Sequence, residues 1–260
     1  MLLDLIPIEI KKSVSYILTD IDDTLTTEGK LPACAYSAME KLSQHGIHII
    51  PITGRPAGWC DMIARFWPVK AVVGENGAFY FCYKHEMQKM VRFYVKNEQE
   101  RLKDRHKLDI LSHEILNKVP GCAISADQSY RVADLAIDFA EDVIKLDDKK
   151  IVEIVDIFHS HGAHAKISSI HINGWFGDYN KLSMTKILFA KEFKINLDTY
   201  RDKVFFIGDS PNDEPMFEYF NHSVGVANIL NFKSKISTMP KWITQKSGGE
   251  GFAEFADLFL

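Results

Sequence analysis

The stretch YILTDIDDTLTTEG, residues 16–29, runs from an apolar segment straight into three carboxylates, Asp20, Asp22 and Asp23. The apolar part, YILT, is typical of a short buried β-strand. In open parallel sheets, ligands bind beyond the carboxyl ends of the strands. Carboxylates that repel one another at such a place cost stability unless a cation or a ligand offsets their charge. The stretch therefore predicts a strand that leads directly into a functional site.

The composition is that of an ordinary globular chain. Its 260 residues are 46% hydrophobic and 25% charged, which is enough for one large domain or two smaller ones. A net charge of −4 and the lack of a long uncharged apolar run indicate neither nucleic-acid nor membrane partners. The N-terminus does not resemble a signal peptide, and the four cysteines are far apart. We therefore expect a cytoplasmic protein. The sequence does not indicate which oligomeric state the protein adopts.

Two parts of the chain alternate strand-like and helix-like patterns, and a third part separates them. The alternation in residues 1–82 and 176–260 is typical of parallel βαβ units. We expect these residues to form a Rossmann-like α/β core, a parallel sheet with helices on both faces. Residues 83–175 read as strand, helix, strand, strand, helix, strand, with AKISSIHI at 165–172 as one half-exposed strand. We expect this segment to be an inserted α+β cap domain.

Four of the predicted core strands end in small, hydroxyl or acidic residues. DIDDT (20–24) follows the first strand, TGR (53–55) the second, GENG (74–77) the third, and GDSPND (208–213) a strand late in the chain. Because the carboxyl ends of parallel strands meet at one edge of a sheet, we expect these residues to converge. The alternative for a lone D-x-D is a purely structural role, in a turn or as a helix cap. The second acidic cluster, after a distant strand, makes this alternative weaker.

The acids predicted at this edge suit a hard cation and a phosphoryl group. They are Asp20, Asp22, Asp209 and Asp213. Mg²⁺ prefers carboxylate oxygens and often shares its shell with a substrate phosphate, whereas zinc would call for His or Cys, which these motifs lack. A carboxylate can attack phosphorus to form an aspartyl-phosphate, and Asp20 is the first acid beyond its strand. Asp22 is a candidate to protonate the leaving oxygen and then to deprotonate the hydrolytic water.

Two hydroxyls and two cations complete the predicted site. Thr24 and Thr53 are candidate donors to phosphate oxygens, with helix capping or strand packing as the alternative for each. Lys181 opens a predicted helix, where the helix dipole disfavours a cation, and this favours a functional role for its charge. Arg55 is expected to grip the substrate or to pair with a carboxylate such as Glu75.

These residues resemble the signature motifs of the haloacid dehalogenase (HAD) superfamily. The four motifs are D-x-D-x-T, here DIDDT at 20–24; a strand-ending Thr, here Thr53; a Lys, here Lys181; and G-D-x-x-N-D, here GDSPND at 208–213. GENGA (74–78), GGEGFAEF (248–255) and the place of the insertion resemble subclass IIB, which has a C2b cap and includes Cof-like sugar-phosphate phosphatases. One departure is visible, because Asp23 stands where that family commonly has glycine.

The resemblance implies a role for each matching acid. Asp20 is implied to be the nucleophile and a Mg²⁺ ligand. Asp22 is implied to be the general acid/base, with its backbone carbonyl on the metal. Asp209 is implied to be a metal ligand, and Asp213 to support the metal shell or Lys181.

The remaining matches are implied to hold the substrate. Thr53 and Lys181 would hold the transferring phosphate, with Thr24, Arg55 and Asn212 as further phosphate or substrate contacts. We therefore predict a Mg²⁺-dependent phosphatase that hydrolyses a small phosphorylated metabolite, preferably a sugar phosphate, through an aspartyl-phosphate. One alternative is a phosphomutase of the phosphomannomutase type, which would need a second phosphate site in the cap. Another is a non-enzymatic module that binds metal and phosphate.

Overall fold

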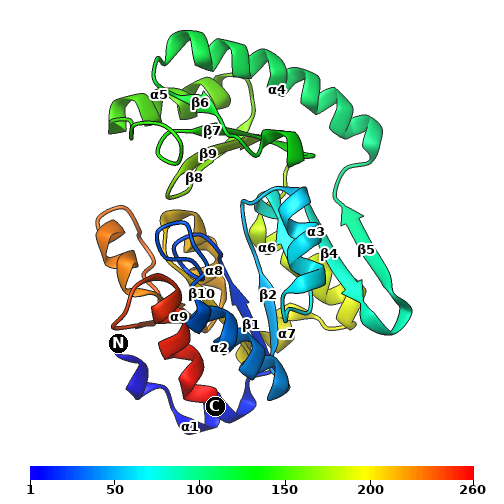
Figure 1. Ribbon diagram of the computed structural model, residues 1–260, viewed down its shortest axis with the longest axis vertical. Helices are drawn as coiled ribbons and strands as arrows, with labels where there is room; N and C mark the ends of the chain where they lie inside the picture. The colour runs from blue at the N-terminus through cyan, green and yellow to red at the C-terminus, as the bar shows by residue number, and fades with distance from the viewer.

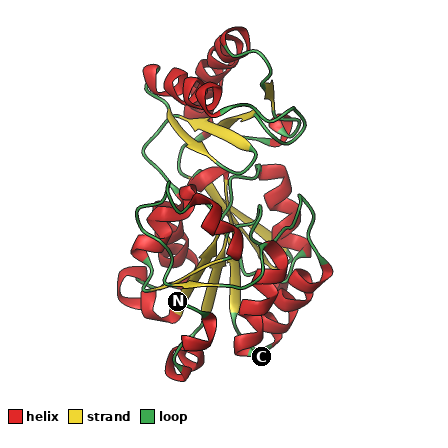
Figure 2. Cartoon of the chain, turned by 90° about the vertical axis from the view of Figure 1, so that its left-hand side faces the viewer, coloured by secondary structure: helices red, strands yellow, loops and turns green.

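The structure, a computed structural model, describes residues 1–260 and consists of two units of different construction (Figure 1). The larger unit, here called the core, contains both chain termini, and the smaller unit, the cap, lies over one end of it. Figure 2 shows the core sheet between layers of helices, with the cap as a separate layer above. This arrangement confirms the predicted α/β core with an inserted α+β cap.

A five-stranded parallel sheet forms the centre of the core. Its strand order is β12-β11-β10-β1-β2, and each neighbouring pair is parallel. In register, Leu18 of β1 lies between Phe206 of β10 and Ile50 of β2. The strands are β1 (Tyr16–Thr19), β2 (His48–Pro51), β10 (Val204–Gly208), β11 (His222–Gly225) and β12 (Trp242–Ile243). The quoted stretch thus supplies the central strand, which is buried along its whole length.

Helices bury both faces of this sheet. Successive side chains of a strand point to opposite faces, and Ile17 and Leu18 of β1 accordingly belong to two different buried apolar clusters. On the Ile17 face lie α1 (Ile8–Ser13), α2 (Ala33–Gln44), α3 (Ala57–Phe66) and α9 (Gly248–Ala256). On the Leu18 face lie α6 (Lys181–Leu188), α7 (Leu197–Tyr200) and α8 (Glu214–Tyr219).

A second, three-stranded sheet extends the core and moves the predicted domain boundary. A parallel bridge between Ile52 and Val73 joins β2 to β3 (Val72–Gly74), which pairs with the hairpin of β4 (Phe79–Lys84) and β5 (Lys89–Tyr94). The predicted start of the cap at residue 83 falls inside this hairpin. Apolar side chains of both hairpin strands pack against the core clusters. We therefore propose that the cap begins near residue 95 and ends near residue 175.

The cap is an antiparallel sheet with helices on its outer face. Its strand order is β6-β7-β9-β8, and its own apolar cluster lies beneath the two helices. The elements are α4 (Glu98–Lys118), β6 (Ala123–Ile124), β7 (Asp134–Asp138), α5 (Asp148–Ser160), β8 (His164–Ile167) and β9 (His171–Trp175). The other face of the sheet turns toward the core (Figure 1). None of the helices, the 21-residue α4 included, is apolar over a length that would cross a membrane.

The prediction of one strand over residues 165–172 is wrong. The segment divides into the end of β8, a turn, and the beginning of β9. The Ser168 hydroxyl accepts hydrogen bonds from the backbone N–H groups of Ile170 and His171, at 3.4 and 3.0 Å. Serine competes in this way with a regular ladder and favours a turn. The resulting β8–β9 turn points at the core.

Candidate active site

The carboxyl ends of β1 and β10 bring three buried acids together. Asp20 follows β1, Asp209 follows β10, and Asp213 ends the 3-10 turn Pro211–Asp213. One carboxylate oxygen from each acid lies within 4.8 Å of the others, and all three residues are at most 5% exposed. The backbone N–H of Asp20 donates to the Ile207 carbonyl at 3.0 Å, so the β1–β10 ladder fixes where this acid begins. The two acidic motifs therefore meet at one sheet edge, as the sequence predicts.

Lys181 places an ammonium group between two of these acids. Its Nζ donates to Asp20 Oδ1 at 3.0 Å and to Asp213 Oδ1 at 2.7 Å. Asn180 caps the helix by accepting from the Ser183 backbone N–H, which sets the position of the first residue of α6. Burial alone would lower the pKa of Lys181, but the two carboxylates raise it above its ordinary value. The ammonium is therefore a fixed positive charge.

The acids still outnumber the cation. Burial raises the pKa of Asp20 to about 7, with Asp213 and Asp22 acting in the same direction and Lys181 against them. Burial, followed by the charges of Asp213 and Asp20, holds the pKa of Asp209 well above its usual range. Both shifts express negative charge that one ammonium does not offset. All the atoms that could ligate a metal here are carboxylate oxygens, so the cluster fits a hard divalent cation such as Mg²⁺.

Hydrogen bonds hold the two acids of the GDSPND motif, Asp209 and Asp213, in place. Asp209 accepts from Thr24 Oγ1 and from Asn228 Nδ2, both at 3.2 Å. The Asp209 backbone N–H donates to Asp213 Oδ2, also at 3.2 Å. A Cβ built at Gly208 would stand 2.4 Å from that Oδ2. Only glycine at this position therefore leaves enough space for the Asp213 carboxylate. Thr24, predicted as a phosphate contact, thus orients an acid in this structure.

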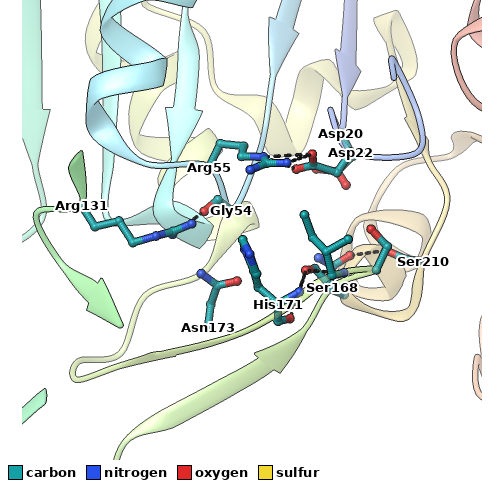
Figure 3. Close-up of a pocket in the computed structure, with 12 residues that line it drawn as sticks. Asp20, Asp22, Gly54, Arg55, Arg131, Ser168, His171, Asn173 and Ser210 are labelled. Atoms are coloured by element: carbon teal, nitrogen blue, oxygen red, sulfur yellow. Dashed lines mark hydrogen bonds and ion pairs between the residues drawn. The ribbon is translucent and has the colours of Figure 1, made fainter. Parts of the chain in front are cut away.

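Asp22 lies next to the three acids, but its carboxylate faces an arginine. Arg55 donates to Asp22 Oδ1 from Nε at 2.9 Å and from Nη2 at 2.8 Å (Figure 3). Its Nη2 also donates to Glu141 Oε1 of the cap at 3.0 Å. Arg55 thus pairs with carboxylates, as one predicted alternative has it, but not with Glu75, which accepts from backbone N–H groups instead. Since the Asp22 side chain is outside the clustered acids, its predicted metal contact rests on its backbone oxygen.

Three further residues singled out in the sequence occupy defined places. Thr53 is buried at the end of β2, and its Oγ1 accepts from the Arg55 backbone N–H at 3.0 Å. Asn212 lines the pocket above the acids and accepts from Ser210 Oγ at 2.7 Å. Asp23 has a φ of 55°, in the left-handed region that favours glycine and that Asp tolerates. Asp23 is therefore a turn residue, which accounts for glycine at this position in related motifs.

The cap supplies pocket residues that were missed from the sequence. His171 and Asn173 of β9 enter the pocket opposite Asp22, beside the β8–β9 turn at Ser168 (Figure 3). His171 Nε2 lies 2.9 Å from Glu141 Oε2. The close contact with His171, together with the charge of Arg55, lowers the pKa of Glu141 to about 2. The pair of serines inside an alternating run was the available signal, because it marks a turn rather than a continuous strand.

Buried polar contacts dock the cap on the core beside this pocket. Glu75, which follows β3, accepts from the backbone N–H groups of Val132 at 3.0 Å and Ala133 at 2.7 Å in the cap. Arg131 of the cap donates from Nη1 to the Gly54 carbonyl of the core at 2.9 Å. The loop that carries Thr53 and Arg55 is therefore in direct contact with the cap.

Comparisons with known proteins agree with this geometry. The family model of the haloacid dehalogenase-like hydrolases matches residues 17–111 and 92–255. The chain belongs to the haloacid dehalogenase-like hydrolases. It is 26% identical over 256 residues to the phosphoglycolate phosphatase of Methanobrevibacter smithii, which covers 95% of this chain and 99% of that protein.

Several solved structures show the same fold. A protein of Thermoplasma acidophilum superposes with a TM-score of 0.72 at 17% identity, covering 95% of this chain and 98% of the other. A HAD subclass IIB sugar phosphatase superposes with a TM-score of 0.63 at 14% identity, covering 95% and 99%. The predictions of the haloacid dehalogenase-like family, of the fold class and of a phosphatase-type enzyme are therefore confirmed.

Proposed function

We propose that this HAD-like hydrolase is a Mg²⁺-dependent phosphatase that hydrolyses a small phosphate monoester through an aspartyl-phosphate on Asp20. The observation that carries the proposal is the buried cluster of Asp20, Asp209 and Asp213 around the Lys181 ammonium. Structural ion pairs do not require three buried acids to share one cation at a strand end, whereas phosphoryl transfer needs a nucleophile and concentrated positive charge.

Two positive charges would serve the reacting phosphate, a bound Mg²⁺ ion and the Lys181 ammonium. Asp20, Asp209 and Asp213, with the backbone oxygen of Asp22, would hold Mg²⁺. When bound, the ion would offset the charge of the acids and of the phosphoryl oxygens. Lys181 supplies the second positive charge at the same place, and it remains charged at any working pH because its pKa is raised.

The reaction follows as two displacements at phosphorus. A carboxylate oxygen of Asp20 attacks, the bond to the ester oxygen breaks, and Asp22 gives a proton to the leaving alcohol. Water then attacks the phosphorus of the aspartyl-phosphate while Asp22 takes a proton from that water. The bond between phosphorus and the Asp20 oxygen breaks, which releases inorganic phosphate and restores the Asp20 carboxylate. Thr53 lies at the end of β2 and would donate to a phosphoryl oxygen during both steps. Arg55 positions Asp22 through hydrogen bonds from Nε and Nη2.

The substrate is expected to be a polar metabolite. The pocket over Asp20 and Asp22 is lined by polar side chains and Gly54, with Ile170 as its one apolar residue. The names of the relatives, a phosphoglycolate phosphatase and a sugar phosphatase, support a phosphorylated small molecule, and we propose a sugar phosphate or a similar ester. We also propose a cytoplasmic location, which the four free cysteines support.

A panel of phosphate esters tests this function. The purified protein is incubated with sugar phosphates and phosphorylated hydroxy acids, with Mg²⁺ or with a chelator, and released phosphate and rearranged esters are measured. We expect phosphate release that stops on chelation and resumes with added Mg²⁺. Acid-quenched samples examined by mass spectrometry should carry phosphate on the peptide that contains Asp20. Isomerised ester without net phosphate release would instead identify a mutase, and turnover that survives chelation would refute the metal assignment.

A further inference from the structure

Arg55 connects the reacting edge of the core to the cap. Its guanidinium donates to the Asp22 carboxylate from Nε and Nη2 (Figure 3). The same Nη2 donates to Glu141 of the cap at 3.0 Å, and Nη1 lies 3.6 Å from Oδ2 of Asp127, a second carboxylate of the cap. The Arg55 side chain is 6% exposed. One buried cation therefore connects an acid of the core to two acids of the cap.

These contacts leave little of Arg55 for a bound phosphate. The Nε–H and both N–H groups of Nη2 already meet carboxylates. The guanidinium also lies over the ring of Trp59 on α3, with its central carbon 4.5 Å from the ring centroid. A planar cation held by carboxylates and by an aromatic face has a defined orientation. Of the two roles that the sequence leaves open for Arg55, the geometry therefore favours pairing with carboxylates over gripping the substrate.

The loop that carries Glu141 is fixed by a buried acid of the cap. Asp138, the last residue of β7, is 1% exposed. Its carboxylate accepts from three successive backbone N–H groups, those of Ala140, Glu141 and Asp142, at 2.9, 2.8 and 2.8 Å. Such bonds from a side chain to the neighbouring backbone define a turn. The side chain of Glu141 thus leaves the loop at a set point, from which it reaches Arg55.

Both oxygens of Glu141 have close neighbours. Oε1 accepts from Arg55, and Oε2 lies 2.9 Å from Nε2 of His171. His171 stands on β9 and is 3% exposed, so the loop after β7 and strand β9 converge on this one carboxylate. A carboxylate held from both sides needs little further ordering when it binds a cation. Arg55 therefore meets a preorganised partner in the cap.

We infer that Glu141 is a positioning residue of the reaction, which acts through Arg55 on the orientation of Asp22. The inference rests on the proposed function, in which Asp22 gives a proton to the leaving alcohol. Arg55 holds the Asp22 carboxylate, and Glu141 holds Arg55. Proton transfer to the leaving oxygen then depends on a cap residue that is not among the clustered acids. Attack by Asp20 on an ester whose leaving group needs no proton does not depend on it.

Two esters with different leaving groups separate proton transfer from the rest of the reaction. The alcohol of glycerol phosphate has to be protonated as it leaves, whereas the nitrophenolate of para-nitrophenyl phosphate is stable as an anion. The loss of each ester is followed in a single turnover, with Mg²⁺ present and the protein in excess. Hydrolysis of the aspartyl-phosphate then does not enter the measured rate.

The variant Glu141→Ala should slow one ester and spare the other. We expect its rate with glycerol phosphate to fall about tenfold, a part of the roughly 10²–10⁴-fold that a positioned general acid contributes. The rate with para-nitrophenyl phosphate should change by less than about twofold, because its leaving group needs no proton. A role in cap docking alone would change both rates by the same factor.

Two further variants of the same loop complete the series. Glu141→Gln keeps an acceptor for the Arg55 N–H but loses the charge, so it should recover part of the rate with glycerol phosphate. Asp142→Ala is the matched control, because Asp142 is the next carboxylate of the loop, is exposed and forms no ion pair. It should leave both rates unchanged.

A spectroscopic measurement tests the same contact without turnover. In isotope-labelled protein, an arginine Nε–H that is held by a carboxylate exchanges slowly with water and gives its own resonance. Arg55→Lys removes the Arg55 resonance and so identifies it. We expect this resonance to be sharp in the wild type and in Asp142→Ala, and to broaden or move in Glu141→Ala.

The outcomes separate this inference from the proposed function. Equal losses with both esters in Glu141→Ala overturn it, and so does an Arg55 resonance that is unchanged in that variant. Absence of phosphate release from every ester by the wild-type protein overturns the proposed function instead. In that case, a resonance that broadens or moves in Glu141→Ala still supports the coupling of Glu141 to Arg55, and one that stays unchanged refutes it.

Discussion

The edge of the core sheet and the underside of the cap face the same pocket, yet they are built by different means. Asp20 and Asp209 follow directly from neighbouring strands in parallel register, so the backbone ladder determines their separation. His171 and Asn173 stand on a cap strand that reaches the core only through side-chain and turn contacts. The reacting groups thus share one rigid element, whereas the groups that select a substrate belong to a unit that has to dock.

The largest effect is expected at the nucleophile, on the edge of the core sheet. Asp20→Asn should lower turnover at least about a thousandfold, because an amide does not attack phosphorus and its neighbours cannot replace it. Steady-state phosphate release measures the loss. Asp23→Asn is the control, since Asp23 serves a left-handed turn that Asn also tolerates. A comparable loss in Asp23→Asn would show that charge in the stretch, rather than the identity of Asp20, carries the reaction.

The next largest effect is expected in the cap. Arg131 has a side chain that is 1% exposed and donates to Asp127 Oδ1 at 2.9 Å and Asp134 Oδ1 at 3.1 Å. Arg131→Met should cost about 3–5 kcal/mol of unfolding free energy, because it leaves buried carboxylates unpaired. Urea unfolding gives the value. Arg65→Met, at a surface pair with Asp61, should cost far less, and equal costs would mean that burial of the network is unimportant.

Metal binding should stabilise the core edge. At a Mg²⁺ concentration of about a hundred times Kd, linkage predicts about 2.7 kcal/mol, which is roughly 5–10 °C in the melting temperature of a chain of this size. Asp209→Asn should abolish most of this shift, because it removes one of the clustered carboxylates. Thermal melts with and without Mg²⁺ provide the measurement. The exposed Asp198→Asn serves as control, and a shift that survives in Asp209→Asn would relocate the metal.

The smallest effect concerns the pH dependence of cap docking. The pKa of Glu141 is lowered from its ordinary 4.5 to about 2, so its stabilising contribution is complete above pH 4.5 and is lost as the pH falls toward 2. Glu141→Gln should therefore flatten the decline of stability between pH 5 and pH 3. Urea midpoints across this range test it, with Glu40→Gln, an exposed carboxyl on α2, as control. If stability falls with pH equally in the wild type and in Glu141→Gln, the charge of Glu141 does not contribute to cap docking.

The core could be predicted because its signals are local. Each apolar run identifies a strand, and the residue that follows the run is necessarily at the carboxyl end of that strand. Parallel pairing then brings Asp20 and Asp209 together although they are far apart in the chain. Lys181 was identifiable for a related reason, since a cation at the start of a helix works against the helix dipole.

The seam between the units could not be predicted, because its contacts depend on docking. Nothing near Arg55 in the sequence points to Glu141, and the partner expected for it, Glu75, is occupied by backbone N–H groups of the cap. The turn at Ser168 was missed because the residues around it alternate as a strand would. Strand β5 was placed in the cap segment because local pattern says that a strand exists, but not which sheet it joins.

Gly208 carries no chemical group, but its place beside Asp213 has a consequence for how the chain tolerates variation. Any side chain there would collide with the Asp213 carboxylate, starting from a contact of 2.4 Å at Cβ. In a library of all single substitutions scored for phosphate release, Gly208 should be as intolerant as the nucleophile, and Gly208→Ala as damaging as larger changes. A selection experiment would thus rank an inert position among the catalytic ones, for reasons of space alone.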